Sequence, residues 1–206
     1  MDARDAAEQI AEAGDGEKFR ARAALWIGIL ALLMAISGLG GGNAAEDMVA
    51  ANVQANDTWA FYQAKNVRQT ANKLAAEELE VQLLLHGDKI SAQAHKTIEG
   101  KIAKMKTTAE RYEDESDPKA PNDPLKGEGK KQLAARAKDF EDQRDRASDQ
   151  DVNFDFADVF LQIAVVLGSV AILALSRPTL AASFVCGALG ALLTLNGFML
   201  WFKMPF

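Results

Sequence analysis

One group of residues in this chain that could do chemistry consists of three carboxylates on one face of a predicted helix. They are Asp151, Asp155 and Asp158, at positions i, i+4 and i+7. Clustered oxygens can hold a hard cation, or attract cations to the mouth of a pore when several copies assemble. No EF-hand loop accompanies this acidic cluster, so the simpler interpretation is that acidic residues replace basic ones beside a membrane. The sequence therefore predicts no metal site.

A second set of polar residues recurs at helical spacing and could recognise another helix. The intervals are 4, 3, 4, 3 and 4 through Asn52, Asn56, Trp59, Gln63, Asn66 and Thr70. Amides between helices hydrogen-bond across the interface and fix its register and oligomeric state. With Trp59 and Tyr62 as aromatic anchors, this seam is predicted to mediate self-association or to bind a partner. The alternative is that the amides face water and only the aromatic residues pack.

Nothing else in the sequence forms a catalytic or cofactor-binding group. His86 and His95 lie nine residues apart on separate predicted elements, and we interpret them as surface residues. There is no nucleophile motif, phosphate-binding loop or metal-ligand cluster. A net charge of −6 without a basic cluster argues against nucleic acid as a partner. We therefore predict a protein without catalytic activity or cofactor.

The elements that position these residues are dominated by three apolar stretches, at 23–39, 159–175 and 180–202. A helix needs about 20 apolar residues to cross a hydrocarbon core of about 30 Å. With their flanks, the stretches predict transmembrane helices at 23–42, 156–176 and 179–202. An acidic N-terminal tail at 1–22 precedes them, and its first 16 residues form either a short surface helix or a disordered segment. A cleaved signal peptide is the alternative for the first stretch, although an acidic tail is atypical of one.

Basic residues indicate which way the chain lies in the membrane. Lys18, Arg20 and Arg22 precede the first stretch, and Arg177 separates the second from the third. The only basic residue beside the membrane on the other side is Lys203. The positive-inside rule therefore predicts a cytoplasmic amino terminus and places residues 43–155 on the opposite side.

Residues 43–155 are predicted to form an extended antiparallel helical hairpin or coiled coil. No Gly or Pro interrupts residues 44–86, Gly87 and Asp88 signal a turn with Asp88 as a possible cap, and a second helix is expected at 89–115. Three prolines then break the pattern, and a third helix starts near Glu128 and can continue into the second apolar stretch. Because large apolar residues are scarce, this domain cannot form a globular core. The predicted fold class is an all-α membrane protein with three transmembrane helices and this hairpin between the first two.

Small residues in the last apolar stretch predict close packing between transmembrane helices. Ala182, Cys186 and Gly190 recur at every fourth position, with Gly187 beside them. Cys186 is the only cysteine, so an intrachain disulfide is impossible. Asn196 is the only strongly polar side chain deep in this stretch, and we expect it to hydrogen-bond to another helix.

Residues 56–66, with the sequence NDTWAFYQAKN, resemble the signature of a family of bacterial membrane proteins catalogued as domain of unknown function 4337. Trp59, Tyr62, Gln63 and Lys65 carry this resemblance. The chain length, the arrangement of one span followed by two, and the helical middle are also similar. The resemblance implies a bacterial membrane protein and brings no activity with it. Together with the orientation, it predicts an inner-membrane location and a periplasmic helical domain.

The sequence thus favours a non-enzymatic membrane scaffold or accessory subunit. Its partners are expected to be the lipid bilayer and further copies of itself, or a larger membrane complex, joined through helix-mediated oligomerisation. The alternative is a small oligomeric channel or transporter component, in which the acidic cluster forms a cation-attracting mouth.

Overall fold

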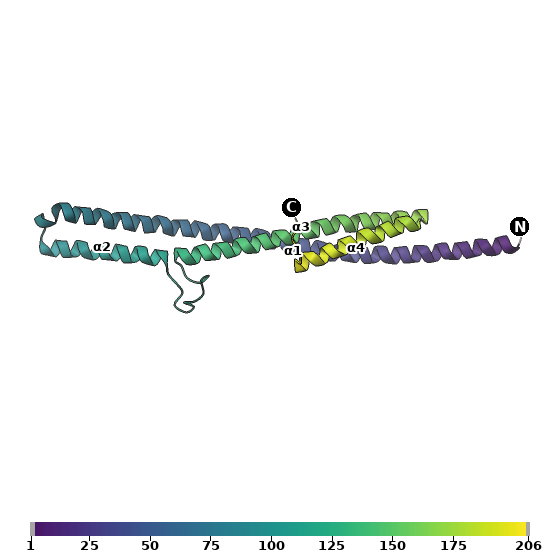
Figure 1. Cartoon of the computed structure of the whole chain (residues 1–206), viewed down its shortest axis with the longest axis horizontal. Helices are drawn as coiled ribbons and strands as arrows, with labels where there is room; N and C mark the ends of the chain where they lie inside the picture. The colour runs from purple at the N-terminus through teal and green to yellow at the C-terminus, as the bar shows by residue number, and fades with distance from the viewer. Residues whose placement is uncertain (1–2, 205–206) are drawn as a thin grey trace. The chain divides into compact units, whose positions relative to one another are not determined.

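The computed structural model describes residues 3–204, with side chains from Gly16 onward (Figure 1). Its elements are α1 (Ala3–His86), a short 3-10 helix η1 (Gly87–Lys89), α2 (Ala92–Glu113), α3 (Lys130–Ala174) and α4 (Arg177–Met199). Within the described range no strand occurs, and the only pairing of that kind is an isolated bridge between Ser116 and Gly127. The predicted all-α class is confirmed.

Three of these helices, α1, α3 and α4, contain segments long and apolar enough to cross a membrane. α1 passes from the first apolar stretch into residues 44–86 without interruption, because strong helix formers follow directly and no proline intervenes. Its backbone begins at Ala3, so the N-terminal tail is helical from that residue. The side chains of the tail before Gly16, and residues 1 and 2 entirely, lie outside the described range.

The start of α2 differs from the expected one. Gly87 and Asp88 do form a turn, within η1, but Asp88 is not the cap of the following helix. Ser91 takes that position, and its Oγ accepts a hydrogen bond from the Ala94 amide at 3.3 Å. α2 therefore begins at Ala92 instead of residue 89 and ends at Glu113 instead of residue 115.

The proline-rich segment separates α2 from α3, as predicted. Two aspartates, Asp117 and Asp123, each accept a hydrogen bond from the amide two residues further on, at 2.8 and 3.0 Å, which shapes successive turns. Gly127 has a φ of +117°, which an L side chain rarely adopts, and a Cβ there would also collide with the Glu115 carbonyl. From Lys130, α3 continues into the second apolar stretch without a break.

A tight turn joins α3 to α4. Leu175 adopts a left-handed conformation, with a φ of 50°, and Ser176 then caps α4 while Pro178 occupies its first turn. At the other end, Leu200 is also left-handed and closes the helix after Met199. The helical part of the third predicted span is therefore shorter than residues 179–202, and Trp201 lies beyond it.

The chain divides into two compact units. The apolar unit comprises Met1–Met48 and Asp145–Phe206, and the arm unit comprises Val49–Arg144. In the apolar unit the core gathers around Leu30, Leu161 and Ala164. In the arm unit the buried apolar residues are mostly alanines, and only Ile102 and Leu133 are larger. The full set is Ala51, Ala55, Ala76, Ile102, Ala109, Leu133 and Ala137.

Candidate functional site

Within the arm unit, α1 carries two residue lines that alternate by four and three positions. The inner line is buried or half-buried and consists of Ala51, Ala55, Thr58, Tyr62, Lys65, Gln69, Asn72, Ala76, Leu79 and Leu83. The outer line is exposed and consists of Val49, Val53, Asn56, Ala60, Gln63, Val67, Thr70 and Leu74. The two lines are offset by two residues, about 200° around a helix, so they occupy opposite faces.

Lys65, on the inner line, is the most unusual buried residue of the arm unit because it is a lysine with only 4% of its surface exposed. Its Nζ lies 3.4 Å from Glu115 Oε2 and 3.5 Å from Glu128 Oε2. The same ammonium lies 5.5 Å from the ring centre of Phe61 and 5.7 Å from that of Tyr112. Two carboxylates and two aromatic faces thus replace the water that a buried lysine loses.

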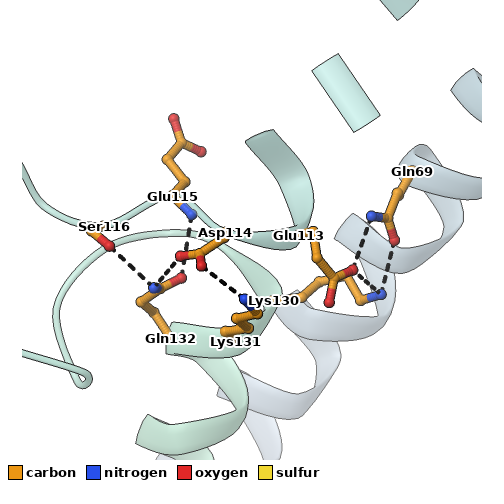
Figure 2. A network of polar contacts seen from close by, with 8 residues as sticks. All are labelled: Gln69, Glu113, Asp114, Glu115, Ser116, Lys130, Lys131 and Gln132. Carbon is orange, nitrogen blue, oxygen red and sulfur yellow. Dashed lines mark hydrogen bonds and ion pairs between the residues drawn. The ribbon is translucent and has the colours of Figure 1, made fainter. Parts of the chain in front are cut away.

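One turn further along the inner line, Gln69 joins α1 to both neighbouring segments (Figure 2). Its Nε2 donates to the Ala109 carbonyl at 2.9 Å and to Glu113 Oε2 at 3.0 Å. Its Oε1 accepts from Lys130 Nζ at 2.8 Å, and Lys130 also contacts Glu113 at 3.1 Å. The hydrogen bond from Gln69, followed by that from Lys130, lowers the pKa of the Glu113 carboxyl below its usual value.

A third group of contacts ties the end of α2 to the start of α3 across the proline-rich segment (Figure 2). Gln132 Nε2 donates to Asp114 Oδ1 at 2.8 Å, and its Oε1 accepts from the Glu115 amide at 3.3 Å. Lys131 Nζ lies 2.9 Å from Asp114 Oδ2. The bond from Gln132, then that from Lys131, lowers the pKa of Asp114, and Asp114 in turn raises the pKa of Lys131.

We call these three groups the polar lock, which consists of Lys65, Gln69, Glu113, Asp114, Glu115, Glu128, Lys130, Lys131 and Gln132. Its members come from α1, the end of α2, the loop after it and the start of α3. Their charged and amide groups bond mainly to one another, so the lock fixes helix register. Of the residues of the polar lock, only Lys65 was connected with the family signature from the sequence. The burial of Lys65 and Gln69 was not predicted. The signal was present, because both fall on the four-three spacing of Ala51, Ala55 and Ala76.

The structure divides the predicted seam between two environments. Trp59 Nε1 donates to Glu141 Oε1 at 2.8 Å, and the Trp59 and Tyr62 rings meet edge to face with centroids 5.4 Å apart. These aromatic contacts lie within the chain. The four amides of the seam are instead exposed, namely Asn52, Asn56, Gln63 and Asn66. Their role in binding another chain stays a prediction.

In the apolar unit, the buried face of α4 is formed largely by small residues. Gly187 and Gly190 are buried, Cys186 is half-buried and Ala182 is exposed. A Cβ on Gly187 would lie 2.6 Å from Trp26 Cζ2, and one on Gly190 would lie 2.7 Å from Leu161 Cγ. Neither glycine can therefore gain a side chain without displacing its neighbour.

Asn196 is fully buried in the apolar unit and bonds to a second buried amide. Its Nδ2 donates to Asn153 Oδ1 of α3 at 2.7 Å and to the Phe202 carbonyl at 2.9 Å, while its Oδ1 accepts from the Phe202 amide at 3.1 Å. The contact with α3 is the kind of cross-helix bond expected for Asn196. Asn153 was missed from the sequence, because it lies outside the predicted spans and carries no distinguishing pattern.

The acidic cluster precedes the apolar part of α3. Asp155 is exposed, whereas Asp151 and Asp158 are half-buried. Burial raises the pKa of Asp151, and the negative charge of Asp155 raises it further. Nearby, Lys203 Nζ lies 2.6 Å from Asp149 Oδ2, a pairing that raises the pKa of Lys203. Among the described residues, no group of three His, Cys, Asp or Glu side chains is arranged to hold a metal ion.

These features define an all-helical protein with three helices able to cross a membrane by length and composition. The chain belongs to the family described as Domain of unknown function (DUF4337), whose model matches residues 19–200. The resemblance of residues 56–66 to this family is therefore confirmed. No curated protein and no solved structure matches the chain.

Proposed function

We propose that this protein is a non-enzymatic membrane scaffold or accessory subunit that acts through helix-mediated association. The observation that carries the proposal is the division of α1 in the arm unit into two faces. The inner line is used by contacts within the chain, whereas the outer line presents amides and aliphatic side chains at helix-pairing intervals to the surroundings. An exposed stripe of this kind is typical of a surface that binds another helix.

The proposed location is a bacterial inner membrane, crossed three times, with the amino terminus in the cytoplasm. Three sufficiently long apolar helices support the crossing. Lys18, Arg20, Arg22 and Arg177 support the orientation, because three crossings bring all four to one side. A reporter fused at Gly100 tests it: alkaline phosphatase should be active there and a cytoplasm-dependent fluorescent protein dark, and the reverse result would invert the topology.

The extramembrane part is, in this proposal, an antiparallel helical hairpin. The order of the contacts that α1 makes with α2 and with the segment directly after it supports this arrangement. Glu80 pairs with Lys106 and Gln69 with Ala109, both in α2, and Lys65 pairs with Glu115 just past its end, so partner numbers rise as numbers in α1 fall. This reversal is what two helices running in opposite directions produce.

We propose no catalytic activity because the ionisable groups of the polar lock pair with one another. Glu113 is bonded by Gln69 and Lys130, and Lys65 faces two carboxylates. A catalytic acid or base needs instead to reach a substrate proton. The polar lock is therefore better suited to setting helix register than to catalysis.

A small oligomeric channel or transporter component is the second candidate. It is favoured by the acidic cluster, where burial and then the charge of Asp155 raise the pKa of Asp151 directly before the apolar part of α3. Several copies would bring such carboxylates into a ring that attracts cations. Purified protein in planar bilayers should then show cation-selective conductance, and bilayers that stay silent would contradict this candidate.

Native mass spectrometry from gently solubilised membranes tests the scaffold. We expect a mass corresponding to two or more copies, or to one copy with a co-purifying subunit. A monomeric mass without any partner, obtained at concentrations where the arm unit keeps its helical circular dichroism, would overturn the proposal.

A further inference from the structure

The outer line of α1 has the composition and exposure of an unoccupied coiled-coil face. Its positions alternate by four and three over residues 49–74, the repeat that keeps one helix face against a partner. Val53, Ala60, Val67 and Leu74 form one half of the repeat, seven residues apart, and Val67 is 68% exposed. These four aliphatic side chains are exposed on one face of a helix whose opposite face is already packed, as is typical of a surface that binds a partner.

We propose that this outer line pairs with the same line of a second copy in a parallel, in-register coiled coil over residues 49–74. The inference rests on the proposed function and specifies the partner and the surface. Copies anchored in one membrane by the same spans share one orientation, so their α1 helices are parallel. Residue 49 also follows the first apolar stretch at the same distance in each copy, which favours identical residues facing each other.

In-register pairing suits the polar members of the outer line. Asn56 would face Asn56 of the second copy, and Gln63 would face Gln63, and each amide carries both a donor and an acceptor for its counterpart. A buried amide pair costs stability but disfavours staggered arrangements, in which an amide would face valine.

Charge complementarity at the end of the line supports the same register. Lys73 directly precedes Leu74, and Glu78 lies five residues beyond Lys73. In a parallel two-stranded coiled coil these are the flanking positions that meet across the interface, so Lys73 faces Glu78 of the second copy and the reverse. An antiparallel pair would separate them. Glu77 would face Glu77 of the second copy, and the two like charges would repel, which is why the pairing ends at Leu74.

Disulfide formation between single cysteines tests the pairing in the full-length protein in native membrane vesicles. The starting variant is Cys186→Ser, which removes the only native thiol. Val67→Cys places a thiol on the outer line, and Arg68→Cys is the matched control, since Arg68 is exposed but lies on neither line. We expect Val67→Cys to form dimers at least about tenfold faster, because a disulfide needs Cβ atoms within a few ångströms.

A charge reversal tests the register. Lys73→Glu in the Val67→Cys background should slow cross-linking by about fivefold, since two exposed ion pairs become two repulsions. Adding Glu78→Lys should restore the rate. Lys73 also lies near Glu113 within the chain, and the double variant leaves that change in place, so recovery reports only the contact between copies.

The outcomes separate the two proposals. Equal cross-linking of Val67→Cys and Arg68→Cys, with native mass spectrometry still showing oligomers, overturns the coiled coil and leaves the scaffold standing. A monomeric mass overturns both. Failure of Glu78→Lys to restore the rate, with Val67→Cys still cross-linking, overturns the in-register arrangement. All substituted positions on α1 are exposed, so unchanged helical circular dichroism serves as the check that each variant folds.

Discussion

In the apolar unit the buried face of α4 consists largely of small residues, and large side chains such as Trp26 and Leu161 pack directly against its glycines. In the arm unit the buried layer is mostly alanine, and charged side chains such as Lys65 lie inside it. The apolar unit therefore depends on close approach of helix backbones. The packing of the arm unit depends instead on specific ion pairs and hydrogen bonds between its polar side chains.

The difference follows from the solvent proposed for each unit. In lipid, apolar side chains gain little by leaving the surroundings, so helices associate through dispersion contacts at short distance. In water, burying a narrow line of alanines contributes little free energy, because each removes little apolar surface. Ion pairs and amide bonds then select one register among several that alanine alone would allow.

The largest expected effect comes from adding a side chain where two helices of the apolar unit pack closely. Gly190→Leu places a branched side chain where even a Cβ would lie 2.7 Å from Leu161 Cγ, so the helices must separate. We expect destabilisation of about 3 kcal/mol, measured by thermal unfolding in detergent. Ala188→Leu, at an exposed position of the same helix, is the control and should change stability by less than about 0.5 kcal/mol. Equal effects would mean that α4 does not pack through its glycines.

The arm unit should respond most to the loss of its buried charge. Lys65→Ala removes the cation shared by Glu115 and Glu128 and leaves a gap between two aromatic rings. The side chain of Glu128 is 70% exposed and can return to water. We therefore expect the free energy of unfolding to fall by about 2 kcal/mol, less than for a fully buried pair. Urea unfolding followed by circular dichroism measures it.

Two variants show what part of the Lys65 effect is electrostatic. Lys65→Met keeps the aliphatic stem between the rings and should recover part of the loss. Lys101→Ala removes a lysine from the exposed surface of α2 and should be nearly silent. If Lys101→Ala and Lys65→Ala are equally destabilising, the polar lock does not hold the arm unit together.

The buried amide pair of Asn196 and Asn153 uses, within the apolar unit, the kind of polar contact on which the arm unit depends. Asn196→Ala leaves Asn153 without its 2.7 Å partner, and we expect a loss of about 1 kcal/mol in detergent. The double variant Asn153→Ala and Asn196→Ala should lose less than the sum of the single variants, because the second substitution removes the stranded amide. Additive losses would show that the two amides do not interact.

The sequence predicted the helices better than it predicted their inner faces. The interruption by Pro118, Pro121 and Pro124 and the unbroken residues 44–86 follow from backbone chemistry, which acts locally. Asp88 was a possible cap from the sequence, whereas Ser91 caps α2; both residue types cap helices well, and only the observed turn distinguishes them.

The buried faces of the helices were harder to predict, because which residues are buried depends on the helix that packs against them. In α4, the line Ala182, Cys186 and Gly190 repeats every four residues, but a helix turns in 3.6, so such a line drifts around it. The buried line instead alternates by four and three, through Ser183, Gly187, Gly190, Thr194 and Gly197, which leaves Ala182 exposed. Lys65 and Gln69 were missed for a related reason, since a buried lysine is unexpected until its acidic partners from distant segments are known.

Acid should loosen the arm unit through the polar lock, with a smaller effect than any of the substitutions above that disrupt packing or buried contacts. The pKa of Glu113 is lowered from 4.5, first by Gln69 and then by Lys130. A carboxyl with a lowered folded pKa stabilises the fold fully above its ordinary pKa, and that contribution disappears as pH falls through the lowered value. Stability should therefore decline below about pH 4.5 by no more than about 1 kcal/mol from this group, because Glu113 is partly exposed.

Urea midpoints between neutral pH and about pH 3 measure this decline, in a range set by the ordinary and lowered pKa values of Glu113. Glu113→Gln should flatten the dependence, since its amide does not titrate, and Glu110→Gln on the exposed side of α2 should leave it unchanged. Asp114, whose pKa is lowered by Gln132 and Lys131, accounts for a residual slope at lower pH in the Glu113→Gln variant. The glycine contacts of the apolar unit do not titrate, and the raised pKa of its Asp151, caused by burial and then by Asp155, favours the fold in acid. If the unfolding of this unit showed the same acid dependence as the arm unit, the contrast between the units would not hold.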